Sequence, residues 1–120
     1  MKLECESCGT RGKYIPGSQF SEIHKHHVLF GRDKRFPAFC NRDFNIADVC
    51  VTCHGLGGNV NHPSYASVKN FSFKRKHMHR LVAQHGYQVI RDWLDSAPAG
   101  KRKGDEWKQA NRMLMQLEPA

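Results

Sequence analysis

Long apolar runs are missing from this sequence. No stretch approaches the roughly 20 apolar residues that a membrane-spanning helix needs, so we expect no membrane association. No apolar run follows the first Met, and the 5 cysteines are an odd number. Both observations argue against a secreted protein built on a disulfide framework. We therefore expect a chain that works in a reducing compartment, the cytoplasm.

Hydrophobic and acidic residues are also scarce. Hydrophobic residues make up 39% of the 120 residues, which predicts one domain with a modest core. Asp and Glu number 11 against 19 Lys and Arg, which gives a formal charge of +8. This charge suits a polyanionic partner such as nucleic acid, although solubility alone explains it in many small proteins. The basic residues are concentrated at Lys74-Arg75-Lys76, beside Arg80, and at Lys101-Arg102-Lys103.

Two Cys-x-x-Cys pairs are the strongest feature that is present. Cys5 and Cys8 form the first pair, and Cys50 and Cys53 form the second. Each pair presents two sulfurs from a tight turn, so the four thiolates can close one tetrahedral structural Zn²⁺ site. Such a metal would offset the modest core. A redox pair or buried free thiols are the alternatives, and Cys40, which has no partner at this spacing, is expected to be a free thiol.

The first half of the chain is expected to form short strands and loops. Residues 1–20 contain turn-forming glycines and a proline, which favour a zinc knuckle followed by a loop. Apolar residues interleave with polar ones over 20–30 and over 45–51, which predicts two strands. Residues 31–42 between them form a polar loop. A helix is expected to begin near residue 52 and to be kept short by the glycines that follow.

The second half of the chain is expected to be helical. Apolar residues recur at helical spacing from Phe73 to Val82, and Gly86 is the expected stop. Amphipathic stripes from Tyr87 to Leu94 and from Asp105 to Leu117 predict two more helices. Residues 96–104 are expected to be a linker. Three histidines of this half are expected to contact solvent or phosphate: His77, His79 and His85.

Histidines stand at particular places between and after the cysteine pairs. His26-His27 lies between the two pairs, Asn45 precedes the second pair, and His54 follows Cys53 directly. Over roughly residues 5–62, this order and spacing resembles the signature of the HNH endonuclease family. The chain looks most similar to small phage-encoded HNH endonucleases that carry a four-cysteine zinc site.

The resemblance implies a ββα-metal fold, in which two antiparallel strands and a helix clasp one divalent ion. The expected fold class is α+β, with a zinc knuckle and C-terminal helices added to that core. Residues 1–65 would be the nuclease core, and residues 66–120 a basic helical extension packed on it. The resemblance also implies DNA as a partner, along with DNA-processing proteins of a phage or its host. The expected location becomes the cytoplasm of a bacterial or phage-infected cell.

The resemblance also implies a role for each matching residue. His27 would be the general base that takes a proton from the attacking water, a task for which an imidazole pKa near neutrality is suited. His26 and His54 would bind a catalytic divalent ion, either Mg²⁺, Mn²⁺, Ni²⁺ or Zn²⁺. Asn45 would hold the loop between the strands and so aim His27. The implied products carry 5′-phosphate and 3′-hydroxyl ends.

Three polar residues near this signature leave alternatives open. His62 is a candidate third metal ligand, or a loop histidine before Pro63. His24 shares a strand face with His26 if the strand is regular. It could support the site, contact a phosphate or lie on the surface, and we favour a surface position or a supporting contact. Asn41 also precedes the second cysteine pair, although its spacing fits less well than that of Asn45.

Two functions remain in view at this point. The leading one is a metal-dependent DNA endonuclease or nickase, and the alternative is a non-catalytic zinc-stabilised DNA-binding module, which has no need of the His26-His27 pair. A thiol redox protein is a third interpretation, but zinc binding leaves it no free thiolate. No helix shows spaced base-reading residues, so strong sequence specificity is not expected. The residues expected to grip phosphates are Arg32, Lys34, Arg35, Lys74, Arg75, Lys76 and Arg80.

Overall fold

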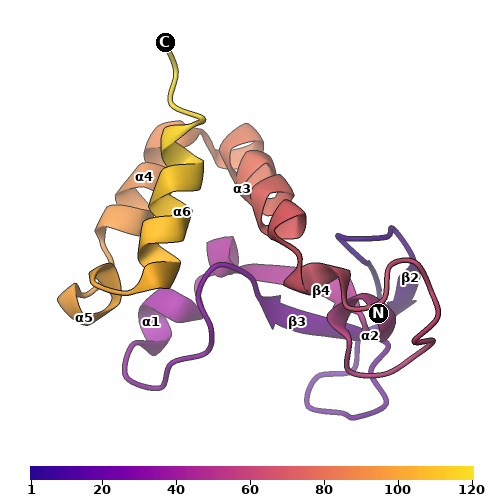
Figure 1. The fold of residues 1–120 in the computed structure, drawn as a ribbon. Helices are drawn as coiled ribbons and strands as arrows, with labels where there is room; N and C mark the ends of the chain where they lie inside the picture. The colour runs from indigo at the N-terminus through magenta and orange to yellow at the C-terminus, as the bar shows by residue number, and fades with distance from the viewer. The chain divides into compact units, whose positions relative to one another are not determined.

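The computed structural model describes all 120 residues and has an α+β fold (Figure 1). Two small two-stranded sheets, β1-β2 and β3-β4, combine with six helices, α1 to α6. The predicted fold class is confirmed at this level, while the specific ββα-metal assignment stays a prediction. None of the helices has the length and apolar character needed to cross a membrane.

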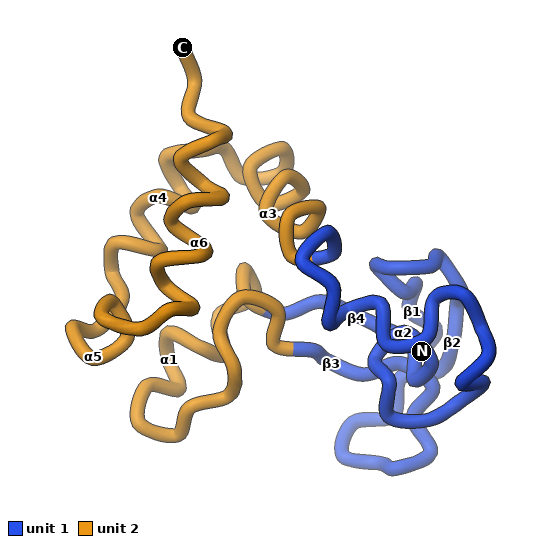
Figure 2. The backbone as a smooth tube through the Cα atoms, in the orientation of Figure 1, with its two compact units in different colours: residues 1–26, 46–73 blue, residues 27–45, 74–120 orange.

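The chain divides into two compact units that are interleaved in sequence (Figure 2). The first unit comprises residues 1–26 and 46–73, and the second comprises residues 27–45 and 74–120. Each unit is therefore built from two separate stretches of chain. The predicted boundary between residues 65 and 66 stays a prediction.

The first unit begins with a small hairpin that the sequence did not reveal. Strands β1 (Lys2–Glu4) and β2 (Arg11–Lys13) pair antiparallel, with Leu3 opposite Gly12. The turn between them is closed by the Cys5 N–H, which donates to the Thr10 carbonyl over 2.8 Å. The predicted knuckle is thus the tip of a hairpin, and β2 lies in the segment where we expected a loop. Strands of three residues are too short to show an alternating pattern.

The second sheet pairs β3 (Ile23–His27) with β4 (Ile46–Cys50). Both predicted strands are confirmed, but β3 is shorter than the predicted 20–30. It ends at His27 because the N–H groups of Leu29 and Phe30 donate to the side chain of Asn45 instead of to a neighbouring strand. The buried apolar residues after His27 therefore belong to the core without being part of a strand.

Strand β4 leads directly into the short helix α2 (Val51–His54). Helix α2 ends at Gly55, which has a left-handed φ of 76°. A side chain there would also be crowded, because a Cβ would lie 2.9 Å from the Ala66 Cβ. The predicted short helix is confirmed, and Gly55 is the residue that stops it. A 3₁₀ turn, η2 (Ser67–Lys69), follows in the same unit.

The second unit contains the helical half of the chain. Helices α3 (Phe71–His85), α4 (Tyr87–Asp95) and α6 (Asp105–Met115) confirm the three predicted helices, and α3 begins in the first unit. Gly86, with a φ of 91°, separates α3 from α4 as predicted. Two one-turn helices lie in segments predicted to be loop or linker. They are α1 (Pro37–Cys40) and α5 (Ala99–Arg102).

Aromatic rings form the core of the second unit. The ring of Phe39 stacks on Trp93 with centroids 4.9 Å apart, and Phe30 meets Phe39 edge-on at 4.9 Å. The Nε1 of Trp107 in α6 donates to the Leu94 carbonyl over 2.8 Å and ties α6 to α4. Cys40 is fully buried in this unit and does not belong to the four-cysteine group described below.

Candidate metal centre and histidine cluster

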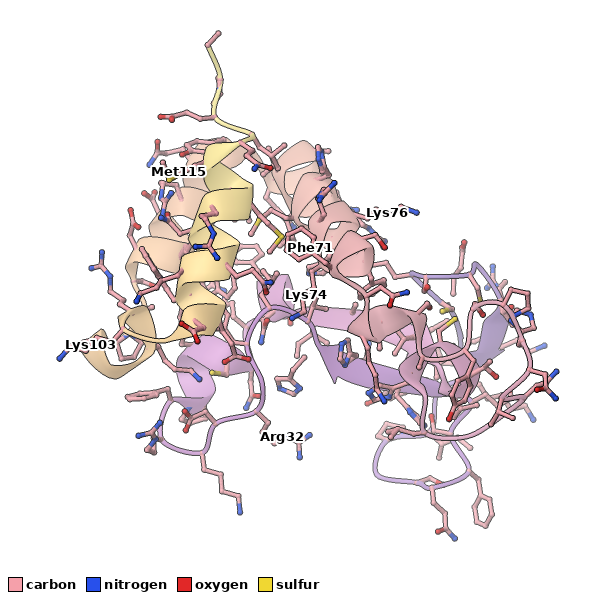
Figure 3. All side chains as sticks on the ribbon, viewed as in Figure 1. Arg32, Phe71, Lys74, Lys76, Lys103 and Met115 are labelled. Carbon is pink, nitrogen blue, oxygen red and sulfur yellow. The ribbon has the colours of Figure 1, made fainter.

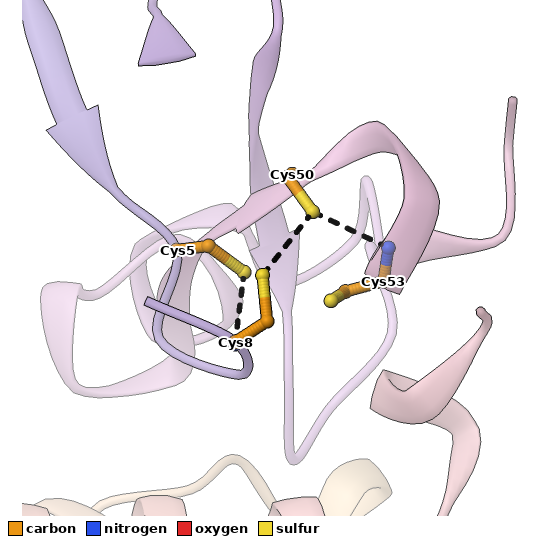
Figure 4. A group of neighbouring side chains, drawn as sticks. All are labelled: Cys5, Cys8, Cys50 and Cys53. Carbon is orange, nitrogen blue, oxygen red and sulfur yellow. Dashed lines mark hydrogen bonds between the residues drawn. The ribbon is translucent and has the colours of Figure 1, made fainter. Parts of the chain in front are cut away.

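Four cysteine side chains converge in the first unit (Figure 4). The sulfurs of Cys5, Cys8, Cys50 and Cys53 all lie within 4.8 Å of one another. Those of Cys8 and Cys50 are 3.8 Å apart. Four sulfurs held about 2.3 Å from one tetrahedral zinc ion are themselves about 3.8 Å apart. The predicted group is confirmed as one positioned to hold a metal ion, and its spacing fits zinc.

Both cysteine pairs have the same local geometry. The Cys8 N–H donates to the Cys5 sulfur over 3.5 Å, and the Cys53 N–H donates to the Cys50 sulfur over 3.5 Å. The first contact lies in the hairpin turn, and the second caps the N-terminus of α2. Backbone N–H groups aimed at a sulfur favour its thiolate form. Each pair is therefore preorganised as a two-sulfur ligand.

The protonation of the four thiols is uneven. Burial raises the pKa of Cys50 to about 12 and also raises the pKa of Cys5. Burial acts on Cys53 in the same direction, but the hydroxyls of Ser64 and Ser67 and the neighbouring thiols outweigh it and lower the Cys53 pKa to about 7. Cys53 therefore loses its proton more readily than Cys5 and Cys50, and a bound cation would draw the protons from those two.

Three histidines gather beside this centre, within the first unit. The ring of His54, at the end of α2, meets the ring of His26 edge-on with centroids 4.9 Å apart. His24 approaches His54 from the same strand face, and their Nδ1 atoms are 2.9 Å apart. Burial lowers the pKa of His54, and nearby His24 and Lys69 lower it further. His54 is thus a neutral imidazole at neutral pH, the form that binds metals.

The predicted base, His27, has a partner that the sequence left open. Its Nε2 lies 2.8 Å from the Oδ1 of Asn41, and both residues belong to the second unit. An amide oxygen only accepts hydrogen bonds, so Nε2 carries the hydrogen and donates it. The other ring nitrogen, Nδ1, then has a free lone pair. Sequence spacing favoured Asn45 over Asn41, and nothing local in the sequence indicated this contact.

Asn45 is fully buried and holds the backbone on both sides of that contact. Its Oδ1 accepts from the N–H groups of Leu29 and Phe30 at 2.8 and 2.9 Å, just after His27. Its Nδ2 donates to the carbonyls of Phe30 and Cys40, each at 2.8 Å. Cys40 directly precedes Asn41. Asn45 therefore links the segment that carries His27 to the segment that carries Asn41, and it touches no solvent.

Replacing Asn45 with Ala should destabilise the second unit strongly. Four buried backbone groups lose their partner at once, so we expect a loss of about 3 kcal/mol or more in the free energy of unfolding. Denaturant unfolding measures this loss. The matched control is Asn59→Ala, because Asn59 is exposed and should change stability by less than about 0.5 kcal/mol. Equal stabilities for the two variants would contradict the role of Asn45.

His77 corrects one prediction. We expected it to contact solvent or phosphate, but it is buried and its Nε2 donates to the Phe44 carbonyl over 2.8 Å. That carbonyl lies in the 3₁₀ turn η1 (Asp43–Asn45), so His77 anchors the turn that contains Asn45. Its place between Phe73 and Leu81 on the buried stripe of α3 was the signal. His79 and His85 are exposed, as predicted.

His62, the candidate third metal ligand, makes its contacts elsewhere. Its Nδ1 accepts from the Ser64 N–H at 3.1 Å and lies 2.8 Å from the Ser64 hydroxyl. That hydroxyl is in turn 3.3 Å from the Cys53 sulfur. His62 also lines a cavity of about 290 Å³ beside Cys8 and Cys50. The structure therefore places His62 near the four-cysteine group. Its role as a third ligand of the ion bound by His26 and His54 stays a prediction.

The predicted basic residues differ in their exposure and surroundings. Arg75, Lys76 and Arg80 lie on the exposed face of α3, and Lys76 projects outward in Figure 3. Lys74 is half-buried, and its Nζ donates to Gln109 over 3.4 Å. Arg32 and Lys34 are exposed, whereas Arg35 donates to both oxygens of Asp33 and lowers the pKa of that carboxyl.

Comparison with known proteins adds no family assignment. No protein-family model matches the chain, and no curated protein or solved structure matches it. The structure itself brings together the four cysteines, His24 and His26 with His54, and His27 with Asn41. These contacts are the basis for a function.

Proposed function

We propose that this chain is a metal-dependent DNA endonuclease or nickase of the HNH type. The observation that carries the proposal is the contact between His27 and Asn41, because it leaves an oriented imidazole with a free Nδ1. His27 directly follows His26 in β3, and His26 packs against the neutral His54. A pure binding module has no need of an oriented imidazole base or of a pair of histidines suited to bind a metal.

The proposed reaction is hydrolysis of a phosphodiester bond. The Nδ1 of His27 accepts a proton from a water molecule as the water oxygen attacks phosphorus. The bond from phosphorus to the 3′ oxygen breaks, and solvent water supplies a proton to that oxygen. The products are a 5′-phosphate and a 3′-hydroxyl. Asn41 acts on this step as a positioning residue, since it keeps the hydrogen of His27 on Nε2.

His26 and His54 are the residues proposed to hold the catalytic ion. Both are partly exposed, so an ion bound to them can be reached by a phosphate. A divalent ion held by these two histidines would supply positive charge to the scissile phosphate and to the leaving oxygen. The four cysteines are proposed to hold a separate, structural zinc. With four protein ligands that site is closed, so it offers no position for substrate.

Phosphate binding is assigned to the exposed basic face of α3. Helical geometry places Arg75 and His79 opposite the buried positions Phe73, His77 and Leu81. Lys76 and Arg80 are exposed on the flank of the same helix. The formal charge of +8 favours a polyanion in general, and this face concentrates it on one rigid helix. Contacts of this kind fix a duplex in place without reading its sequence.

Neutralising this face should change the salt dependence of DNA binding. A triple variant with Arg75→Gln, Lys76→Gln and Arg80→Gln should reduce the slope of log affinity against log salt by about 2–3, since each phosphate contact contributes about 0.9. Fluorescence anisotropy with a labelled duplex measures the slope. The control is Lys74→Gln, which should change it little because Lys74 is tied to Gln109. An unchanged slope in the triple variant would move the contact surface to another basic segment, such as residues 31–42.

The chemistry of the products tests the proposal. A nicked duplex made by the zinc-loaded protein with Mn²⁺ should be resealed by DNA ligase, which requires adjoining 5′-phosphate and 3′-hydroxyl ends. Pretreatment with phosphatase should block resealing. Nicks that ligase closes only after 3′-phosphate removal and 5′ phosphorylation would contradict the proposed direction of bond cleavage.

A further inference from the structure

His24 is the histidine whose position the proposed function leaves unexplained. It lies two residues before His26 on β3, so regular alternation places both side chains on one face of the strand. It is partly exposed and forms no salt bridge. Its ring centroid is 5.1 Å from that of His54, and its Nδ1 is 2.9 Å from the His54 Nδ1.

We infer that His24 is the third protein ligand of the catalytic ion, so that His24, His26 and His54 form a three-imidazole metal site. This inference rests on the proposed function for the purpose of the ion, but on the histidine geometry for its ligands. Two nitrogens bound to one ion at about 2.1 Å lie about 3.0–3.4 Å apart. The distance between the two Nδ1 atoms is close to that range.

His54 is the member that joins the other two. Its ring contacts both His24, at a centroid distance of 5.1 Å, and His26, at 4.9 Å, and all three residues lie in the first unit. The site is thus assembled from one strand face and the end of one short helix. Gly55 stops that helix directly after His54 and so determines where the His54 ring stands.

The rival third ligand, His62, is less suited to this site. Its Nδ1 is already engaged by the N–H and the hydroxyl of Ser64. Its side chain faces the cavity beside Cys8 and Cys50. A set of three imidazoles also has a chemical consequence, because nitrogen ligands favour Zn²⁺, Ni²⁺ and Co²⁺ over Mg²⁺. The inferred site therefore selects a borderline transition metal as its ion.

Titration of the zinc-loaded protein with Ni²⁺ in a calorimeter tests the inference without reference to cleavage. The wild-type protein should bind one Ni²⁺ beyond its structural zinc. His24→Ala should weaken this binding at least 10-fold, whereas His62→Ala should leave it within about 2-fold of wild type. His79→Ala is the matched control for incidental binding by an exposed histidine. Zinc content and melting temperature show whether each variant is folded. If His24→Ala does not fold, His24→Gln replaces it in the titration.

The outcomes separate this inference from the proposed function. Wild-type affinity in both His24 variants, or a loss confined to His62→Ala, overturns the three-imidazole site. A protein that binds Ni²⁺ through His24 but cuts no DNA supports the site and contradicts the nuclease. A protein that cuts DNA while its His24 variants keep full Ni²⁺ affinity supports the nuclease and contradicts the three-imidazole site. No second ion bound to wild type overturns the site as well.

Discussion

Removing metal from the four-cysteine group should unfold the first unit. The strands of its two sheets are only three and five residues long. The metal is therefore expected to provide stability that an extended hydrophobic core would otherwise supply. Structural zinc contributes on the order of 10 kcal/mol in apparent terms to small zinc-binding peptides. We therefore expect a strong chelator to abolish the cooperative thermal transition of this unit and zinc to restore it.

A single cysteine substitution should have the same effect. Cys50→Ala removes one ligand and the N-terminal cap of α2, so zinc content and melting temperature should both fall. The matched control is Cys40→Ala, which removes a buried cysteine outside the group and should leave the zinc content at one per chain. A Cys50→Ala protein that keeps its zinc and its melting temperature would contradict the structural metal site.

Replacing His27 with Ala should remove DNA cleavage while the protein stays folded. Loss of a general base lowers turnover by about 10²- to 10⁴-fold. His27 is partly exposed, and its side chain is hydrogen-bonded to the exposed Asn41, so stability should change little. The rate of plasmid nicking measures turnover, and calorimetric Ni²⁺ binding and DNA affinity should stay near wild type.

Metal rescue distinguishes the base from a ligand. His54→Ala should weaken binding of the catalytic ion, so a high concentration of Mn²⁺ should restore part of its activity. The same concentration should do nothing for His27→Ala, because no ion replaces a proton acceptor at that position. The cleavage rate of Asn41→Ala should lie between those of wild type and His27→Ala. The substitution should lower turnover and leave DNA affinity unchanged. Cleavage by His27→Ala at the wild-type rate would exclude His27 as the base.

Local patterns in the sequence were enough for much of this architecture. Paired spacing identified Cys5, Cys8, Cys50 and Cys53, because two tight turns with two sulfurs each have few other uses. Helical periodicity located α3, α4 and α6, and Gly86 marked the break between the first two. These features depend on residues a few positions apart, which a single sequence displays directly.

Contacts between distant residues were beyond such patterns. The end of β3 is determined by the Asn45 side chain, which lies 15 and 16 residues from the N–H groups it binds. The partner of His27 is 14 residues away, and that of His77 is 33 residues away. Each is a hydrogen bond formed only when the backbone has folded, so neither composition nor periodicity reveals it. The contact of His24 with His54, 30 residues apart, belongs to the same class.

Incubation of supercoiled plasmid with the zinc-loaded protein tests the central claim most directly. Mg²⁺, Mn²⁺ and Ni²⁺ are supplied in parallel, each with and without excess chelator, beside the His27→Ala protein. The account predicts that the wild-type protein converts supercoiled DNA to relaxed or linear forms with at least one of these ions. It predicts no conversion with chelator and none with His27→Ala. A wild-type protein that binds the plasmid but leaves it intact with every ion would contradict the nuclease and favour a non-catalytic, zinc-stabilised DNA-binding module.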